Sequence, residues 1–325
     1  MSRRVRVFLL LITGLLVIGG SVPLLGVAQP TAPQSAYQSH YLVFGTQDAS
    51  GTPRILAIDF NRTERGPDRV DYEYKLFVAR GADWSMPIYE TWSADPDTTS
   101  RLPSRGGLTP TLTEDGTVRV EVDLPDLSIT VVPQAPRFSF STGDGEASRT
   151  AHPRFAVDWN GTSYEGRGVY EWIQLAPTGA SGSKEADAEA ERRLSEEATF
   201  GLYDWIVLYD DEGRLWHVSQ GSLSDHFGYQ AATDALPAQT RDVWVQWTAT
   251  AYDETADQHS PTAWLVDVPE WGLRVKLKKQ GEHRGHGAPQ ADGTRPIYVQ
   301  ASASGPGIVQ GEKHQFFGMV EHIRD

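Results

Sequence analysis

The amino-acid sequence predicts an all-β protein made of two antiparallel β-barrel domains in tandem. Three observations support this fold class. Several segments alternate apolar and polar residues with the period of two that is typical of strands with one buried face. Turn signals that combine acidic residues with glycine separate pairs of apolar segments. In addition, three short motifs occur twice in the chain, in the same order, and a duplicated β domain is the simplest explanation of that order.

The first 28 residues predict a targeting segment. Three arginines among the first six residues precede an apolar run from Val7 to Ala28, which is the pattern of a secretory signal peptide. Small residues at positions 26–28 suit cleavage by a signal peptidase, whereas the length of the run also meets the ~20 residues that span a bilayer. We therefore expect export to the periplasm or the extracellular space, with residues 1–28 either removed or kept as a membrane anchor.

The first β domain is predicted over residues 38–176. Within it, Val118–Leu124 alternates apolar and charged residues, and Asp48–Gly51 separates two apolar segments as a hairpin turn would. Residues 177–199 are predicted to form an exposed linker with a short helix, because Ser183 can cap a segment rich in Ala, Glu and Arg. The polar surface of this helix favours a connector over a core element.

The second β domain is predicted over residues 200–325. Asp210–Gly213 is a second hairpin turn signal, and Leu273–Lys278 alternates apolar and basic residues. A longer strand is expected at Val243–Tyr252, where the odd positions are apolar, so that one face meets a core or a cavity. Each half has about 145 residues, which suits an eight-stranded barrel or a close relative.

Three pairs of motifs link the two halves. The pairs are Tyr41–Phe44 with Trp205–Leu208, Leu124–Ile129 with Val268–Leu273, and Gly168–Glu171 with Gly318–Glu321. Their common order indicates that corresponding positions of the two halves occupy corresponding places in the fold.

Composition excludes several classes of site. The chain has no cysteine, so it has no disulfide, thiolate metal site or thiol nucleophile. A formal charge of −14 disfavours nucleic acid as a partner. The nine histidines show no metal-binding signature, since His283 and His286 are expected in a Gly-rich loop and neither a His-Glu-x-x-His motif nor another closed ligand set appears. We therefore expect neither a metal nor another cofactor.

The order of the motifs resembles that of a known protein family. The relevant segments are Gly166–Trp172, Asp204–Arg214, Ser260–Pro261, Trp264–Pro269 and Gly318–Glu321. They are similar to the tandem lipocalin-like family of hydroxyneurosporene synthase, which includes carotenoid hydratases, secreted lipocalin-like proteins encoded near export systems and some Diels–Alderases. The resemblance implies two lipocalin-like barrels and an apolar ligand such as an isoprenoid. It departs from the family at Trp172, which replaces a histidine, at Glu171, which replaces an aspartate, and at Gln300, which replaces a glutamate.

Two carboxyl groups are the candidates for catalysis. Inside an apolar barrel the pKa of Glu171 would be raised, and a protonated carboxyl group can act as a general acid on an alkene. Asp204 is a second candidate, which could form a carboxylate couple with Glu171. The alternative for both residues is structural: Glu171 as a hydrogen-bonded rim residue, and Asp204 as a cap or strand opener. The candidate ligand-binding residues are the aromatic neighbours Tyr170, Trp172, Tyr203 and Trp205.

Three functions remain open at this point. The first is an exported protein that binds a hydrophobic small molecule or lipid, and it needs only an apolar pocket. The second is a cofactor-independent hydratase or cyclase that acts on an isoprenoid-like alkene with Glu171 as general acid. The third is an interaction module associated with export, which needs an exposed apolar patch. The departures from the family pattern favour the first function.

Overall fold

The computed structural model describes residues 37–65, 68–95, 102–113, 118–134, 138–141, 148–151, 154–175, 202–221, 227–231, 238–290 and 292–324. Within these ranges the chain forms strands and turns, the strands pair antiparallel, and the helical element is the short 3-10 turn η1 (Pro269–Trp271). The predicted all-β fold is thus confirmed. The targeting segment (1–28) and the predicted linker helix (177–199) lie outside the described residues. In the part that is described, no helix is long and apolar enough to cross a membrane.

The first half of the chain folds into two facing sheets. Sheet 1 contains β1 (Tyr37–Gln47), β2 (Pro53–Glu64), β3 (Val70–Arg80), β4 (Asp83–Ala94), β8 (Phe138–Ser141), β9 (Ser148–Ala151) and β12 (Gly168–Leu175). Sheet 2 contains β5 (Leu108–Leu112), β6 (Val118–Leu124), β7 (Leu127–Gln134), β10 (Arg154–Trp159) and β11 (Thr162–Gly166). Their strand orders are β4-β3-β2-β1-β12-β9-β8 and β11-β10-β7-β6-β5.

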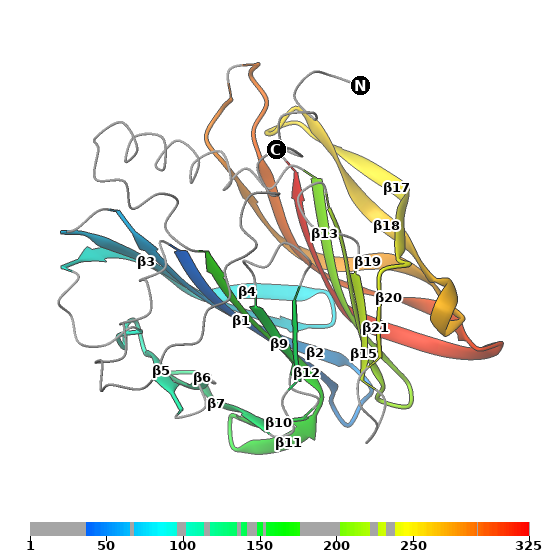
Figure 1. The fold of residues 1–325 in the computed structure, drawn as a ribbon, viewed down its shortest axis with the longest axis horizontal. Coiled ribbons are helices and arrows are strands. Elements are labelled where there is room, and N and C mark those ends of the chain that lie inside the picture. Colours follow the sequence, from blue (N-terminus) through cyan, green and yellow to red (C-terminus); the bar gives the residue numbers. More distant parts are fainter. Residues whose placement is uncertain are drawn as a thin grey trace, which may run out of the picture.

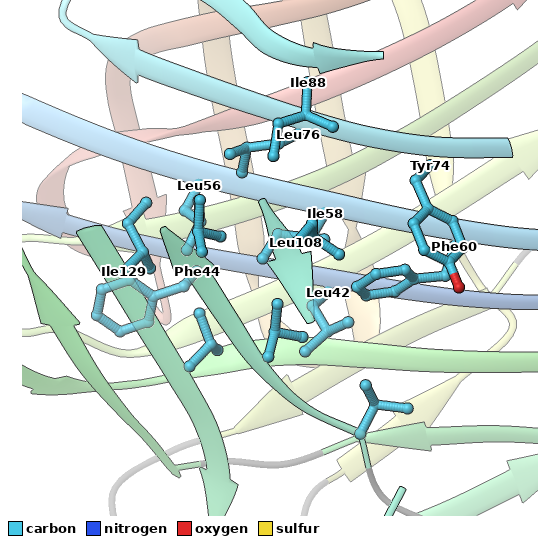
Figure 2. Packing of buried hydrophobic residues seen from close by; sticks show 14 of the residues in the cluster. Leu42, Phe44, Leu56, Ile58, Phe60, Tyr74, Leu76, Ile88, Leu108 and Ile129 are labelled. Carbon is cyan, nitrogen blue, oxygen red and sulfur yellow. The ribbon is translucent and has the colours of Figure 1, made fainter. Parts of the chain in front are cut away.

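An apolar core fills the space between sheets 1 and 2. Figure 2 shows Leu42 and Phe44 of β1 together with Leu108 of β5 and Ile129 of β7, all of them buried. Each such side chain contributes roughly 1.5–3 kcal/mol when it leaves water. Side chains therefore occupy the interior of this barrel-like unit where the core is described.

The second half folds into a single curled sheet, sheet 3. Its strands are β13 (Leu202–Asp210), β14 (Leu215–Gly221), β15 (Phe227–Ala231), β16 (Ala238–Thr240), β17 (Trp244–Asp253), β18 (Gln258–Val268), β19 (Leu273–His286), β20 (Ile297–Val309) and β21 (Glu312–Arg324). The strand order is β16-β15-β14-β13-β21-β20-β19-β18-β17. The curl brings the two arms of the sheet around a second core, in which Trp216 of β14 and Trp264 of β18 are fully buried.

The central strands of the two halves correspond residue by residue. In sheet 1, β1 lies between β2 and β12, and Tyr41 is opposite Glu171. In sheet 3, β13 lies between β14 and β21, and Trp205 is opposite Glu321. The first and third motif pairs found in the sequence therefore occupy the same register in the two sheets.

Sheet 1 is covered on both faces, by sheet 2 on one side and by sheet 3 on the other (Figure 1). Along β1, Leu42 enters the core shared with sheet 2, whereas Tyr41 and Val43 enter an apolar layer shared with sheet 3. We call this layer the interface layer. It also contains Trp205 and Val207 of β13. Because both faces of β1 and β13 are buried, these strands read as continuous apolar runs, as buried strands do.

Most of the predicted local elements are confirmed, with one correction. The expected strand at 118–124 is β6, and the two hairpin turns join β1 to β2 and β13 to β14. The strand expected at 243–252 exists as β17, but most of its length is exposed, including Ala249 and Ala251. β17 is the edge strand of sheet 3, and its register shifts twice between Trp247 and Thr250. Only its first residues face the core, so its apolar alternation does not mark a wholly buried face.

Candidate functional site

Two glutamates lie in the interface layer, and each is linked, directly or through Gln300, to an aromatic residue of the other half. Trp205 Nε1 donates to Glu171 Oε1 at 3.1 Å. Tyr41 is linked to Glu321 through Gln300, whose side-chain amide donates to the Tyr41 hydroxyl and to the Glu321 carboxyl group. The two aromatic rings also contact each other, with centroids 5.1 Å apart. This exchange of contacts follows from the matched registers, which place Tyr41 opposite Glu171 and Trp205 opposite Glu321.

Glu171 sits in the more deeply buried part of the layer. Its exposed fraction is 3%, and that of the neighbouring His217 on β14 is 0%. His217 Nε2 is 3.7 Å from Glu171 Oε1, and its ring is 4.4 Å from that of Trp205. The carboxyl group of Glu171 is therefore held between an indole N–H and an imidazole ring.

Glu321 belongs to a larger polar cluster on β20 and β21. The side-chain amide of Gln300, which is fully buried, donates to Glu321 Oε2 and to the Tyr41 hydroxyl. Tyr298 donates from its hydroxyl to Glu321 Oε2 at 3.4 Å. Tyr41 also donates to Gln300 Oε1 at 3.2 Å. Four polar side chains from both halves thus form one network inside an otherwise apolar layer, and we call it the Glu321 cluster.

Charged residues of sheet 1 complete this network. Lys75 Nζ is 3.7 Å from Asp59 Oδ2, and it lies 5.4 Å from the ring centroid of Tyr298. Burial raises the pKa of Glu321 to about 7, and the negative charge of Asp59 adds to this effect. Burial also raises the pKa of Asp59 to about 6, although the Lys75 charge opposes the rise. A carboxyl group that is half protonated near neutral pH is the state that general acid catalysis requires.

A small cavity lies beside the Glu321 cluster. It has a volume of about 120 Å³ and is lined by Gly81 and Ala82 from sheet 1 and by Ser302 and Gly318 from sheet 3, among others. Ser302 is two residues from Gln300 along β20, and it donates to the Gly81 carbonyl oxygen at 2.7 Å. The volume is below the ~300–1,000 Å³ of a typical ligand pocket, so the cavity by itself is too small for a whole ligand of that class.

The structure separates Glu171 from two of the aromatic residues that were expected beside it. Tyr170 and Trp172 are on the opposite face of β12 and enter the core shared with sheet 2. There His40 stacks on both rings, and its Nδ1 is 2.7 Å from the Tyr170 hydroxyl. Burial lowers the pKa of His40 to about 4. Successive residues of a strand point to opposite faces, so Glu171 cannot share a pocket with both of its neighbours.

Asp204 likewise does not form the expected couple with Glu171. It lies on the opposite face of β13 from Trp205, in the interior of sheet 3. Its carboxylate accepts hydrogen bonds from Trp247 and Trp264, and His322 Nδ1 is 3.1 Å away. The alternative role of Asp204 as a cap is also not what the structure shows, because its partners come from β17, β18 and β21.

Of the predicted aromatic residues, Trp205 and Tyr203 remain in the layer that contains Glu171. Trp205 is buried in the interface layer, and Tyr203 packs against it while partly exposed. The sequence alone did not single out Glu321, Asp59 or His322 as site residues. The signal for Glu321 was available, because the motif pair Gly168–Glu171 and Gly318–Glu321 makes it the counterpart of Glu171.

One group of potential metal ligands occurs among the described residues. Asp210, Asp211 and His314 bring their ligand atoms within 4.8 Å of one another. The guanidinium group of Arg214 already pairs with this group, since its Nε is 2.6 Å from Asp210 Oδ2. Asp210 also accepts backbone N–H groups of the β13–β14 turn. The group therefore has a structural explanation as a turn that is fixed by an ion pair.

Comparison with known proteins shows the fold of the chain. It matches none of the protein-family descriptions and none of the curated sequences with which it was compared. Its structure is similar to a crystal structure assigned to AttH from Nitrosomonas europaea, with a TM-score of 0.56 and 13% identity over 94% of this chain and 98% of that one. It is also similar to kievitone hydratase from Nectria haematococca, with a TM-score of 0.51 and 11% identity over 89% of each chain. These likenesses show that the chain shares the overall fold of these two proteins.

Proposed function

We propose that the chain is a cofactor-independent acid–base enzyme that adds water to an apolar alkene, or cyclises it, at the interface layer. The observation that carries this proposal is Glu321, a carboxyl group whose pKa is raised to about 7 and which lies in a network drawn from both halves. A fold shared with a protein named as a hydratase is compatible with this function.

Glu321 would supply the proton in the reaction. Its O–H proton moves to one carbon of the double bond, and the electron pair of the double bond forms the new C–H bond. A water molecule then adds to the other carbon and returns a proton to the Glu321 carboxylate, so water is the only co-substrate. The nearby rings of Tyr41 and Tyr298 would stabilise the cationic intermediate through cation–π attraction.

Glu171 takes a different role in this proposal from the one expected from the sequence. Its carboxyl oxygen accepts the Trp205 N–H, and His217 lies beside it. We propose that this pair fixes the geometry of the layer while Glu321 transfers the proton. Glu171 as general acid remains the competing assignment, and the experiment below separates the two.

The test is turnover of a lycopene–detergent dispersion in H₂¹⁸O, with product detected by mass spectrometry. Wild-type protein should form an ¹⁸O-labelled alcohol or a cyclised isomer. Glu321→Gln should lower turnover by on the order of 100-fold, whereas Glu171→Gln should retain most of it. A loss confined to Glu171→Gln would move the acid role to that residue. Absence of product with wild-type protein would contradict catalysis on this class of alkene.

Binding without turnover is the second candidate function. It is favoured by Gln300, because the residue opposite Glu321 in the β20–β21 ladder is an amide and not a second acid. A binder needs only the apolar layer and the cavity. Quenching of tryptophan fluorescence by lycopene, equal in wild type and Glu321→Gln and without product in either, would support this function.

Export remains a proposal that rests on the sequence of residues 1–28. It would place either function in the periplasm or outside the cell, with a mature start near Gln29. N-terminal sequencing of the protein from its native host tests this, and recovery from membranes with Met1 or Ser2 still present would establish the anchor alternative.

A further inference from the structure

The interior of sheet 3 holds a buried aspartate–histidine pair that the proposed function does not use. His322 Nδ1 is 3.1 Å from Asp204 Oδ1. Trp264 Nε1 donates to the same oxygen at 3.1 Å, and Trp247 Nε1 donates to Asp204 Oδ2 at 2.8 Å. The exposed fractions of Asp204 and His322 are 3% and 0%.

The hydrogen bonds of this group leave one atom without a partner. Indole N–H groups can only donate, so both oxygens of Asp204 act as acceptors. The carboxylate therefore favours the tautomer of His322 that carries its proton on Nδ1, in which Nε2 is an acceptor. His322 Nε2 is buried and has no hydrogen-bond partner within the described residues. A buried polar atom left in this state costs about 1–3 kcal/mol.

The fold does not require a polar pair at this position. The equivalent strands of the first half place His40 opposite Trp172, at the register where β13 and β21 place Asp204 opposite His322. In the first half no carboxylate stands at either position. The same arrangement of strands thus occurs once with an aspartate–histidine pair and once without. The pair is therefore not required to form the fold.

The pair lies close to the surface of the molecule. Trp247, which donates to Asp204, is partly exposed and sits on the edge strand β17. The register of β17 shifts between Trp247 and Ala249, and such bulges often redirect a side chain at a functional site. The Trp247 ring, whose centroid is 5.1 Å from that of His322, therefore lies between this pair and the solvent.

We infer that the interior of sheet 3 binds an apolar alcohol or phenol, whose hydroxyl group donates to His322 Nε2 while its hydrocarbon body packs on Trp247 and Trp264. A hydroxyl group supplies the donor that Nε2 lacks, and the indole rings supply an apolar wall. A hydrocarbon of the same shape would leave Nε2 buried without a partner. Sites built around a hydrogen bond to a ligand hydroxyl discriminate against such analogues. The site is distinct from the interface layer and does not depend on catalysis by Glu321.

The experiment compares two matched pairs of probes by tryptophan fluorescence titration. The pairs are geraniol with 2,6-dimethyl-2,6-octadiene, and 2-naphthol with naphthalene. In wild type, at least one hydroxylated probe should bind about tenfold more tightly than its hydrocarbon, as one neutral hydrogen bond provides. His322→Phe should abolish this preference. Trp172→Phe, at the equivalent position of the first half, and Glu312→Gln, at an exposed position of β21, should both preserve it.

A measurement on unmodified protein keeps the inference testable if His322→Phe does not fold. Long-range ¹H–¹⁵N NMR reports the Nε2 resonance of His322, which should move upfield when a hydroxyl group donates to its lone pair, and should stay in place with the hydrocarbon. Equal affinities within both probe pairs, a preference that persists in His322→Phe, or an Nε2 resonance unmoved by either saturating alcohol would overturn the inference.

Discussion

Trp205 Nε1 donates a hydrogen bond to Glu171 Oε1 over 3.1 Å, although the two residues belong to different halves of the chain. In the other direction, Gln300 joins Tyr41 to Glu321, because its amide donates to both side chains. The two halves are therefore connected by exchanged polar contacts within an apolar layer. Because a buried hydrogen-bonding group must keep its partner, these contacts fix how sheets 1 and 3 meet.

Trp205→Phe, which removes an indole N–H that donates a hydrogen bond, should lower the free energy of unfolding more than Trp216→Phe does. Trp205→Phe leaves the Glu171 oxygen without its indole N–H, which should lower the free energy of unfolding by about 1–3 kcal/mol beyond the packing loss. The matched control is Trp216→Phe, because Trp216 is equally buried and its Nε1 has no hydrogen-bond partner in the described part of the chain. Urea unfolding measures both. Equal losses would show that the Trp205–Glu171 bond contributes nothing to stability.

Close approach of the two halves should depend on Gly281. A Cβ atom at this position would lie 1.8 Å from the backbone oxygen of Ala82, in the turn between β3 and β4. Gly281→Ala should therefore destabilise the protein by about 1–3 kcal/mol or more, as overpacking does. Gly285 lies on the same strand, and a Cβ atom there would meet nothing within 4 Å, so Gly285→Ala should have little effect. Thermal unfolding of the two variants compares them, and similar melting temperatures would contradict the observed contact.

The contribution of Glu321 to stability should fall as pH rises from about 4.5 to about 7. Its pKa is raised to about 7 from 4.5, so the folded state keeps a proton that the unfolded chain has released. The group therefore disfavours folding progressively between about pH 4.5 and 7, by up to about 3 kcal/mol above this range. Glu321→Gln should remove this contribution, which leaves that of Asp59 with the same sign and that of His40 with the opposite sign.

The measurement for this prediction is the free energy of unfolding in urea at intervals from pH 5 to pH 8. The exposed Glu312 on the same strand provides the control, and Glu312→Gln should keep the wild-type slope. A slope unchanged in Glu321→Gln would rule out a raised pKa at Glu321.

A second pH effect is expected on the acid side from His40. Burial lowers its pKa from 6.5 to about 4. Between these pH values His40 is therefore protonated in the unfolded chain and unprotonated in the folded protein. Stability should therefore be lost as pH falls from about 6.5 towards 4, by about 3 kcal/mol in total. His40→Phe should reduce this loss, whereas His259→Phe, at an exposed position, should not. NMR titration of the ring protons of His40 checks the same point directly, since they should show no titration above about pH 5.

The alternation of side chains along β12 explains why the predicted grouping of Glu171 with its sequence neighbours was wrong. The period of two by itself places Glu171 on the opposite face from Tyr170 and Trp172, so their grouping into one pocket was wrong. What the period does not reveal is which face meets the other half. Both faces of β1 and β13 are buried. The sequence therefore does not show that Leu42 faces sheet 2 whereas Val43 faces sheet 3.

By itself the sequence determined the β character of the chain, its turns and its internal correspondence, because these depend on neighbouring residues. Asp48–Gly51 and Asp210–Gly213 set hairpins locally, and alternation at Val118–Leu124 set a strand. Only the tertiary structure decided the chemistry. The pKa of Glu321 depends on Asp59, which lies more than 250 residues away along the chain, and the partner of Asp204 is His322. Desolvation and charge act through space, and the packing of sheet 3 on sheet 1 creates the distances on which they depend.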